Sequence, residues 1–210
     1  MTKPVIIIGA GGHAKVVIDT LKKCGMKILG AVDSNSSRHG TNILGIPVLG
    51  TDDVVAIHKP DSIFLANGVG STSDATLRQE IFKRFKEQGY TFTTLIHPTA
   101  IIAEDVKIGE GSQVMAGTVL QPGIRMGVNC IMNTSASIDH DCIIGDHVHI
   151  APGATLSGSI RIGDLVHVGT GASIIQQISI GRQSIVGAGA VVVHSVGTHK
   201  TVIGNPAKAI

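Results

Sequence analysis

A histidine and an aspartate stand side by side at His140 and Asp141, and this pair is suited to proton transfer. Imidazole has an unperturbed pKa of about 6.5, so it can accept a proton near neutral pH. A neighbouring carboxylate can orient the ring and raise its basicity. A lone histidine in a repeat is usually an ordinary surface residue, so the pair needs a supporting motif before it implies a function.

A glycine-rich turn, Gly9-x-Gly11-x-x-Ala14, is the second stretch with chemical meaning. Together with Asp33, about 20 residues further on, it fits the dinucleotide-binding fingerprint. Such a turn exposes backbone N–H groups to phosphates, which belong either to NAD or to a nucleotide sugar. His13 departs from the usual NAD pattern, and fewer than 100 residues precede the repeats described below, too few for a complete dinucleotide fold. A nucleotide sugar is therefore the preferred ligand.

The elements that position this turn form an α/β pattern over residues 1–97. We expect strands at 5–8, 28–32 and 62–66, helices at 14–23 and 75–88, and a closing segment at 91–96. Strands that alternate with helices indicate a parallel sheet, so this part is predicted to be a Rossmann-like domain. Asn67-Gly68 follows a strand's carboxyl end, where ligands of open α/β sheets bind.

A repeat of six residues replaces this pattern over residues 98–210. Sixteen successive hexads begin with an aliphatic residue or Met, at Ile102, Ile108, Val114, Leu120, Met126, Met132, Ile138, Ile144, Ile150, Leu156, Ile162, Val168, Ile174, Ile180, Val186 and Val192. The fifth position is always small or apolar. Such a repeat predicts a triangular solenoid in which positions five and one point inward, six and two point outward, and three and four turn the corner. A β-sandwich would need hairpin turns and period-two patterning instead.

These hexads resemble those of the hexapeptide-repeat acyltransferases, which fold as left-handed parallel β-helices and form trimers. The closing residues 202–208, Val-Ile-Gly-Asn-Pro-Ala-Lys, resemble that family's final motif. The turn Gly9-Ala10-Gly11-Gly12-His13, Asn133-Thr134 and His140-Asp141 narrow the resemblance to sugar acetyltransferases of the sialic acid O-acetyltransferase type. That group includes acetyl-CoA-dependent N-acetyltransferases of nucleotide-linked 4-amino sugars, used in surface glycan synthesis. The resemblance implies this activity, with sialic acid O-acetylation as the alternative.

The resemblance also implies site residues. His140 is expected to be the catalytic base and Asp141 its supporting acid. Acetyl-CoA is expected at Asn133, His149, Gly158, Gly169, Thr170, Gly187 and Ala188, and the nucleotide amino sugar at Gly11, Gly12, His13, Asp33, Ser34, Asn35 and Gly68. No metal is expected. Gln176-Gln177 replaces a proline-containing turn of many relatives. His167, one coil beyond His149, either lines the pantetheine groove or is simply a polar surface residue.

The hexad register predicts an assembly. Asn133 and His149 point outward on strands one coil apart, so they share a face, whereas His140 lies at the opposite corner. These groups cannot meet within one subunit. We therefore expect a homotrimer whose active sites lie between subunits, with His140 and Asp141 from one chain and Asn133 and His149 from its neighbour.

Two other classes of function remain open from sequence. An NAD-dependent oxidoreductase would rest only on the glycine-rich turn and Asp33. A γ-class carbonic anhydrase would need three zinc-binding histidines that meet across a subunit interface. His140, His149 and His167 could imitate that set, although the Rossmann-like half argues against it.

The composition indicates a partner class and a compartment. The formal charge is +2 and no long basic run is present, so we expect no nucleic-acid partner. No apolar run approaches the roughly 20 residues needed to span a bilayer, so no membrane insertion is expected. Three cysteines without metal or redox spacing indicate a reducing compartment, and a cytoplasmic location is predicted.

Overall fold

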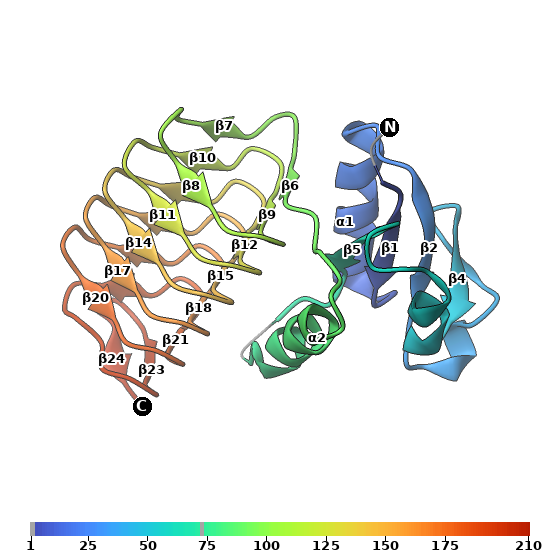
Figure 1. The fold of residues 1–210 in the computed structure, drawn as a ribbon. Helices are drawn as coiled ribbons and strands as arrows, with labels where there is room; N and C mark the ends of the chain where they lie inside the picture. Colours follow the sequence, from blue (N-terminus) through green and yellow to red (C-terminus); the bar gives the residue numbers. More distant parts are fainter. Residues whose placement is uncertain (1–2, 72–73) are drawn as a thin grey trace.

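The computed structural model describes residues 3–71 and 74–210 and contains an α/β half followed by a β-helix (Figure 1). The α/β half has one sheet in the order β3-β4-β2-β1-β5. Its elements are β1 (Val5–Ile8), α1 (Gly12–Lys23), β2 (Ile28–Val32), the 3₁₀ helix η1 (Ser36–Arg38), β3 (Asn42–Ile43), β4 (Ile46–Gly50), the 3₁₀ helix η2 (Asp52–Ile57), β5 (Phe64–Asn67) and α2 (Thr76–Glu87). The parallel pairing of β1 with β2 and with β5 confirms the predicted α/β fold.

The sequence pattern did not predict the strands β3 and β4. They form an antiparallel hairpin at the sheet edge, and its turn holds Leu44 at φ +50° and Gly45 at φ +78°. The turn lacks the Asn-Gly or Asp-Gly pair that usually identifies a hairpin, and leucine rarely adopts a positive φ. The sequence therefore did not indicate this hairpin. The predicted elements otherwise occur with boundary shifts, because α1 begins two residues before the expected position and β5 spans 64–67 instead of 62–66.

The β-helix has three faces, each a stack of short strands that are two residues long and parallel except at the end of face 1. Face 1 contains β6 (Leu95–Ile96), β9 (Gln113–Val114), β12 (Ile131–Met132), β15 (His149–Ile150), β18 (His167–Val168), β21 (Ile185–Val186), β23 (Thr201–Ile203) and the antiparallel β24 (Lys208–Ala209). Face 2 contains β7 (Ile101–Ile102), β10 (Val119–Leu120), β13 (Ser137–Ile138), β16 (Thr155–Leu156), β19 (Ser173–Ile174) and β22 (Val191–Val192). Face 3 contains β8 (Lys107–Ile108), β11 (Arg125–Met126), β14 (Ile143–Ile144), β17 (Arg161–Ile162) and β20 (Ser179–Ile180).

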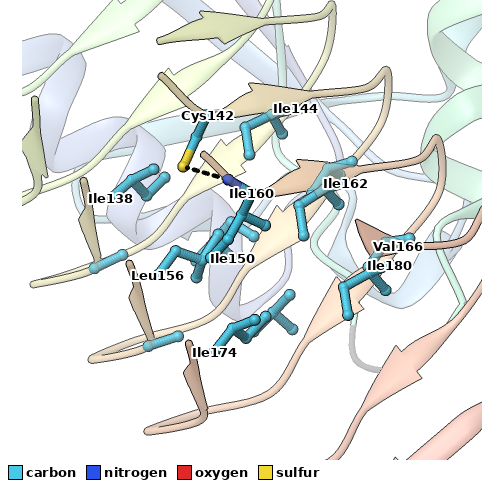
Figure 2. Close-up of a cluster of buried hydrophobic side chains, with 14 of the residues drawn as sticks. Ile138, Cys142, Ile144, Ile150, Leu156, Ile160, Ile162, Val166, Ile174 and Ile180 are labelled. Carbon is cyan, nitrogen blue, oxygen red and sulfur yellow. Dashed lines mark hydrogen bonds between the residues drawn. The ribbon is translucent and has the colours of Figure 1, made fainter. Parts of the chain in front are cut away.

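The predicted hexad geometry is confirmed. Strand partners are eighteen residues apart, as in Ser137 paired with Thr155, so three hexads complete one coil. Residues at hexad positions one and five fill the interior, where Ile138, Cys142 and Ile150 are fully buried (Figure 2). Position four often has a positive φ, including +60° at Asp141, which turns the chain from one face to the next.

The two halves pack together through face 1 and its neighbouring corner. The imidazole Nε2 of His13 in α1 lies 2.7 Å from the side-chain oxygen of Gln113, whose amide nitrogen donates to the carbonyl of Asn67. Arg78 of α2 is 1% exposed and donates to the carbonyls of Asn67 and Asn129. These bonds satisfy polar groups that burial would otherwise penalise, so they join the halves in a defined arrangement.

The helices of this fold are short. Among the described residues, none is long and apolar enough to cross a membrane.

Candidate active site

His140 and Asp141 form an exposed pair at the corner between faces 2 and 3, where β13 leads into β14. The imidazole Nδ1 lies 2.9 Å from the Asp141 carboxylate, and 58% of the His140 side chain is exposed. The hydrogen bond with Asp141 is the main cause that raises the pKa of His140 above its ordinary value. A ring that binds the carboxylate through Nδ1 leaves Nε2 free to accept a proton from a substrate.

Gly158 lies one coil beyond His140 at the same corner. A Cβ atom at Gly158 would come within 2.6 Å of the His140 ring, so the glycine leaves the space that the ring occupies. The sequence expectation grouped Gly158 with the acetyl-CoA residues on face 1. Within one subunit the structure does not bring it to them.

Asn133 and His149 are in contact on face 1, as the hexad register predicts. The side-chain nitrogen of Asn133 lies 3.1 Å from Nε2 of His149. Nδ1 of His149 lies 2.7 Å from the carbonyl oxygen and 3.0 Å from the hydroxyl oxygen of Ser71, in the loop after β5. Burial, followed by the neighbouring His167, lowers the pKa of His149 to about 3, so this ring is neutral at physiological pH.

A groove of about 370 Å³ runs along face 1 beyond this pair. Its lining contains five of the seven residues expected at acetyl-CoA together with neighbours from the same coils; it consists of Ser71, His149, Ala151, Pro152, His167, Gly169, Thr170, Ile185, Val186, Gly187 and Ala188. His167 therefore lines the groove, and its ring lies edge-on to that of His149 with centroids 4.9 Å apart. The small residues at 169, 187 and 188 leave room for an extended ligand beside the coil.

A second cavity, of about 190 Å³, lies at the carboxyl ends of β1 and β2 and includes Gly9, Asp33, Ser34 and Val69 in its lining. Asp33 accepts from the backbone N–H of Ala10 and from Nη1 of Arg38, at 2.7 and 2.8 Å. Burial would raise the pKa of Asp33, but bonds from the N–H groups of Asn35 and Ala10 and from Arg38 outweigh it, so the pKa is lowered.

Of the seven residues expected at the nucleotide sugar, only Asp33 and Ser34 line this cavity. Gly11 is the N-cap of α1 and Gly12 is its first residue. Because glycine has no side chain, Gly11 does not cap the first N–H groups of the helix. Gly68 packs against Gly9, since a Cβ atom there would lie 2.7 Å from the Gly9 carbonyl oxygen. Asn35 caps η1 with its side chain.

His13 lines a third cavity of about 450 Å³ instead, which also includes Gly70, Ser71, Asp74, Leu77, Asn133 and His149. Leu77 belongs to both this cavity and the second one, and Ser71 and His149 belong to both this cavity and the groove. The three spaces therefore adjoin in one subunit. Burial, then the charge of Arg78, lowers the pKa of His13 to about 4, so His13 is neutral as well.

The corner that bears His140 does not belong to this series of cavities. It joins β13 on face 2 to β14 on face 3, whereas Asn133 and His149 lie on face 1. In a three-sided prism that corner is opposite face 1. The two parts of the expected site are thus separated within a subunit, as the hexad register predicts.

Comparison with known proteins assigns the family. Residues 4–85 match the PglD N-terminal domain model. A GDP-perosamine N-acetyltransferase of Escherichia coli O157:H7 is 29% identical over 162 residues, which are 73% of this chain and 70% of that protein. PerB from Caulobacter crescentus, solved with CoA and GDP-perosamine, is 36% identical with a TM-score of 0.91, and the alignment covers 100% of this chain and 98% of PerB. The chain belongs to the hexapeptide-repeat N-acetyltransferases of nucleotide-linked 4-amino sugars.

A further acetyltransferase structure agrees with this assignment. The acetyltransferase domain of PglB from Neisseria gonorrhoeae, solved with acetyl coenzyme A, is 37% identical with a TM-score of 0.91, and both chains are covered completely. Membership confirms the predicted Rossmann-like and β-helical fold. It also confirms the predicted activity, transfer of an acetyl group from acetyl-CoA to a nucleotide-linked amino sugar.

The three histidines that a γ-class carbonic anhydrase zinc site would use do not meet within one subunit. Among the residues that the structure describes, no group of three His, Cys, Asp or Glu side chains is arranged to hold a metal ion. His149 and His167 lie together, but His140 is at the opposite corner.

Sequence reasoning missed three residues that connect the α/β half to the β-helix. Ser71 lies in a loop without a motif, and Gln113 occupies an outward hexad position that appears solvent-exposed until the α/β half covers it. Arg78 lies in a charged amphipathic helix, where arginine is normally exposed. The six-residue repeat shows which side chains point outward from the β-helix. It does not show which of them the α/β half covers.

The pair of His140 and Asp141 leads to a pH prediction for this N-acetyltransferase. A base must be unprotonated to act, so kcat/KM should fall on the acid side as pH drops through the pKa of His140. Because Asp141 raises that pKa, Asp141→Asn should move the acid limb to lower pH while reducing the maximal rate. Asp139→Asn is the matched control, since Asp139 acts on the ring by charge alone and should shift the limb less. An unchanged acid limb in Asp141→Asn would show that His140 does not control it.

Proposed function

We propose that this N-acetyltransferase is a cytoplasmic homotrimer that acetylates the 4-amino group of a UDP- or GDP-linked sugar for surface glycan synthesis. The active sites would lie between subunits. The α/β half, with a boundary near residue 97, would bind the nucleotide, and the β-helix would bind acetyl-CoA. The three adjoining cavities, which share Ser71, His149 and Leu77 in their linings, are the observation that carries the proposal.

Each cavity suits one part of the reactants. The cavity at Gly9, Asp33 and Ser34 lies at the carboxyl edge of a parallel sheet, which is the usual nucleotide position in such folds. The groove along face 1 suits the extended pantetheine of CoA. The third cavity, which contains His13, Asn133 and His149, adjoins both of these spaces and is called the central cavity below. It would receive the sugar amine and the thioester. Reactants held in adjoining sites react with a large entropic advantage.

His140 of a neighbouring subunit would complete the central cavity. The neutral sugar amine attacks the thioester carbonyl carbon, and its proton passes to Nε2 of His140 while Asp141 stabilises the imidazolium. When the tetrahedral intermediate collapses, the carbon–sulfur bond breaks and the thiolate of CoA takes the proton back from His140. The products are the N-acetylated sugar nucleotide and free CoA thiol, and the base is regenerated.

A trimer would bring the corner of one prism against face 1 of the next, three times over. Gly158, which leaves space for the His140 ring, would then have a second role. It would lie beside that ring at the acetyl-CoA groove of the neighbouring subunit. This accounts for its place beside His140 and for its expected contact with the donor.

A thiol-release assay tests the function directly. The purified protein is mixed with acetyl-CoA and a panel of UDP- and GDP-linked 4-amino sugars, and CoA release is followed together with the mass of the acetylated product. We expect turnover with at least one 4-amino sugar and no turnover with the corresponding 4-hydroxy sugar. Turnover with sialic acid but with no amino sugar would support the O-acetyltransferase alternative and overturn the proposal.

A further inference from the structure

Ser71 binds a ring that the proposed function places at the acetyl group. The carbonyl oxygen of Ser71 lies 2.7 Å from Nδ1 of His149, and its hydroxyl oxygen lies 3.0 Å from the same atom. A carbonyl oxygen can only accept a hydrogen bond. Nδ1 must therefore carry a proton, because two acceptors at 2.7 Å would repel each other.

The second ring nitrogen of His149 is consequently an acceptor. His149 is 7% exposed, and burial lowers its pKa to about 3, so the ring carries one proton and that proton is on Nδ1. Nε2 then holds a lone pair, which accepts from the side-chain N–H of Asn133 at 3.1 Å. The side-chain oxygen of Asn133 accepts from the backbone N–H of Thr134 at 2.8 Å, which fixes the orientation of the amide.

One N–H of the Asn133 amide remains. It has no hydrogen-bond partner within residues 3–71 and 74–210, and Asn133 lines the central cavity beside His149. The amide group is planar, so holding one N–H on His149 determines the direction of the other.

We propose that Ser71 is a positioning residue that holds His149 as the Nδ1–H tautomer, so that Asn133, and not His149, donates to the thioester carbonyl. His149 acts by orienting Asn133. The inference rests on the proposed function for the identity of the ligand, the thioester. The tautomer of His149 follows from hydrogen bonds within one subunit and does not depend on that ligand.

The loop that carries Ser71 is itself anchored. Nη1 of the buried Arg78 donates to the carbonyl of Val69 at 2.7 Å and to that of Asn67 at 3.1 Å. Val69 lines the nucleotide cavity and Ser71 lines the acetyl-CoA groove, so a single short segment contacts both binding sites. The α/β half therefore serves the donor site of its own subunit as well as the nucleotide site.

Nitrogen-15 NMR of the full-length protein measures the tautomer. In protein labelled at histidine, the His149 signals are assigned by their loss in His149→Gln, with His194→Gln as a control from an exposed turn of the last coil. We expect the neutral Nδ1–H pattern from about pH 5 to pH 9, and the same pattern in Ser71→Ala, which keeps the carbonyl. A neutral Nε2–H pattern, or titration to imidazolium within that range, would overturn the proposal.

Kinetics separate the roles of the two side chains. Asn133→Asp removes the donor at constant size and should lower kcat by about 10²- to 10³-fold, with the Kd of CoA, which lacks the acetyl group, nearly unchanged. His149→Gln keeps an oxygen able to accept from Asn133 and should lose less activity than Asn133→Asp. The reverse order would make His149 the donor and overturn the inference. Absence of any wild-type turnover would instead reject the proposed function, while the tautomer result would stand.

Discussion

Replacement of His140 by glutamine is expected to lower kcat for acetyl transfer by about 10²- to 10⁴-fold at neutral pH. Glutamine fits the same space above Gly158 but cannot accept the amine proton. The binding of CoA should change little. Within the described residues, the His140 side chain forms a hydrogen bond only with Asp141, so its loss disturbs no other contact of this kind. The loss should shrink at high pH, where the amine is already neutral.

The measurement is kcat as a function of pH for the variant and the wild type, together with the Kd of CoA by calorimetry. His194→Gln is the matched control, since His194 is also exposed on a β-helix turn but lies on the last coil. Activity within a few-fold of wild type in His140→Gln would remove the histidine from the proton-transfer step. A loss that persists unchanged at high pH would point to a positioning role instead.

Mixed trimers of two inactive variants are expected to recover activity. His140→Gln lacks the base and Asn133→Asp lacks the donor, and the proposed site takes these residues from adjacent subunits. Every trimer that contains both variants then has one site of its three with both residues intact. Random mixing in equal amounts should restore about one quarter of wild-type activity, since about three quarters of the trimers are mixed.

Co-expression with two different affinity tags isolates the mixed trimers, and sedimentation confirms their mass. Subunits of the same variant carried through the procedure are the control and should stay inactive. Mixed trimers without activity would place both residues in a single-subunit site, which their positions on opposite sides of the prism disfavour. A stable monomer with full activity would contradict the shared site altogether.

The β-helix was predictable from sequence because its repeat is local. One aliphatic residue in every sixth place determines which side chains are inside, and a strand partner eighteen residues away follows from three hexads in each coil. The separation of His140 from Asn133 and His149 follows from the same count. No comparable rule applied to the β3–β4 hairpin, where Leu44 adopts a left-handed conformation without a turn motif.

The junction between the halves was not predictable, because it depends on tertiary contacts. His13 was expected to bind the nucleotide sugar, yet its Nε2 contacts Gln113 on the β-helix and it lines the central cavity. Ser71 gave no signal at all. The part of the site that involves a single repeat could be read from its spacing, whereas the part formed by two packed units required their arrangement in space.

The uninterrupted coil also determines how the length of this protein can change. Removing eighteen residues from the β-helix would leave each later side chain on its original face and only shorten the stack, since strand partners are separated by that number. Removing six would keep the hydrophobic interior but turn every later residue by a third of a revolution. His149 would then leave the face of Asn133 and lose its contact with Ser71 of the α/β half. The face on which each later side chain falls therefore limits insertions and deletions between these residues, in addition to the packing of the interior.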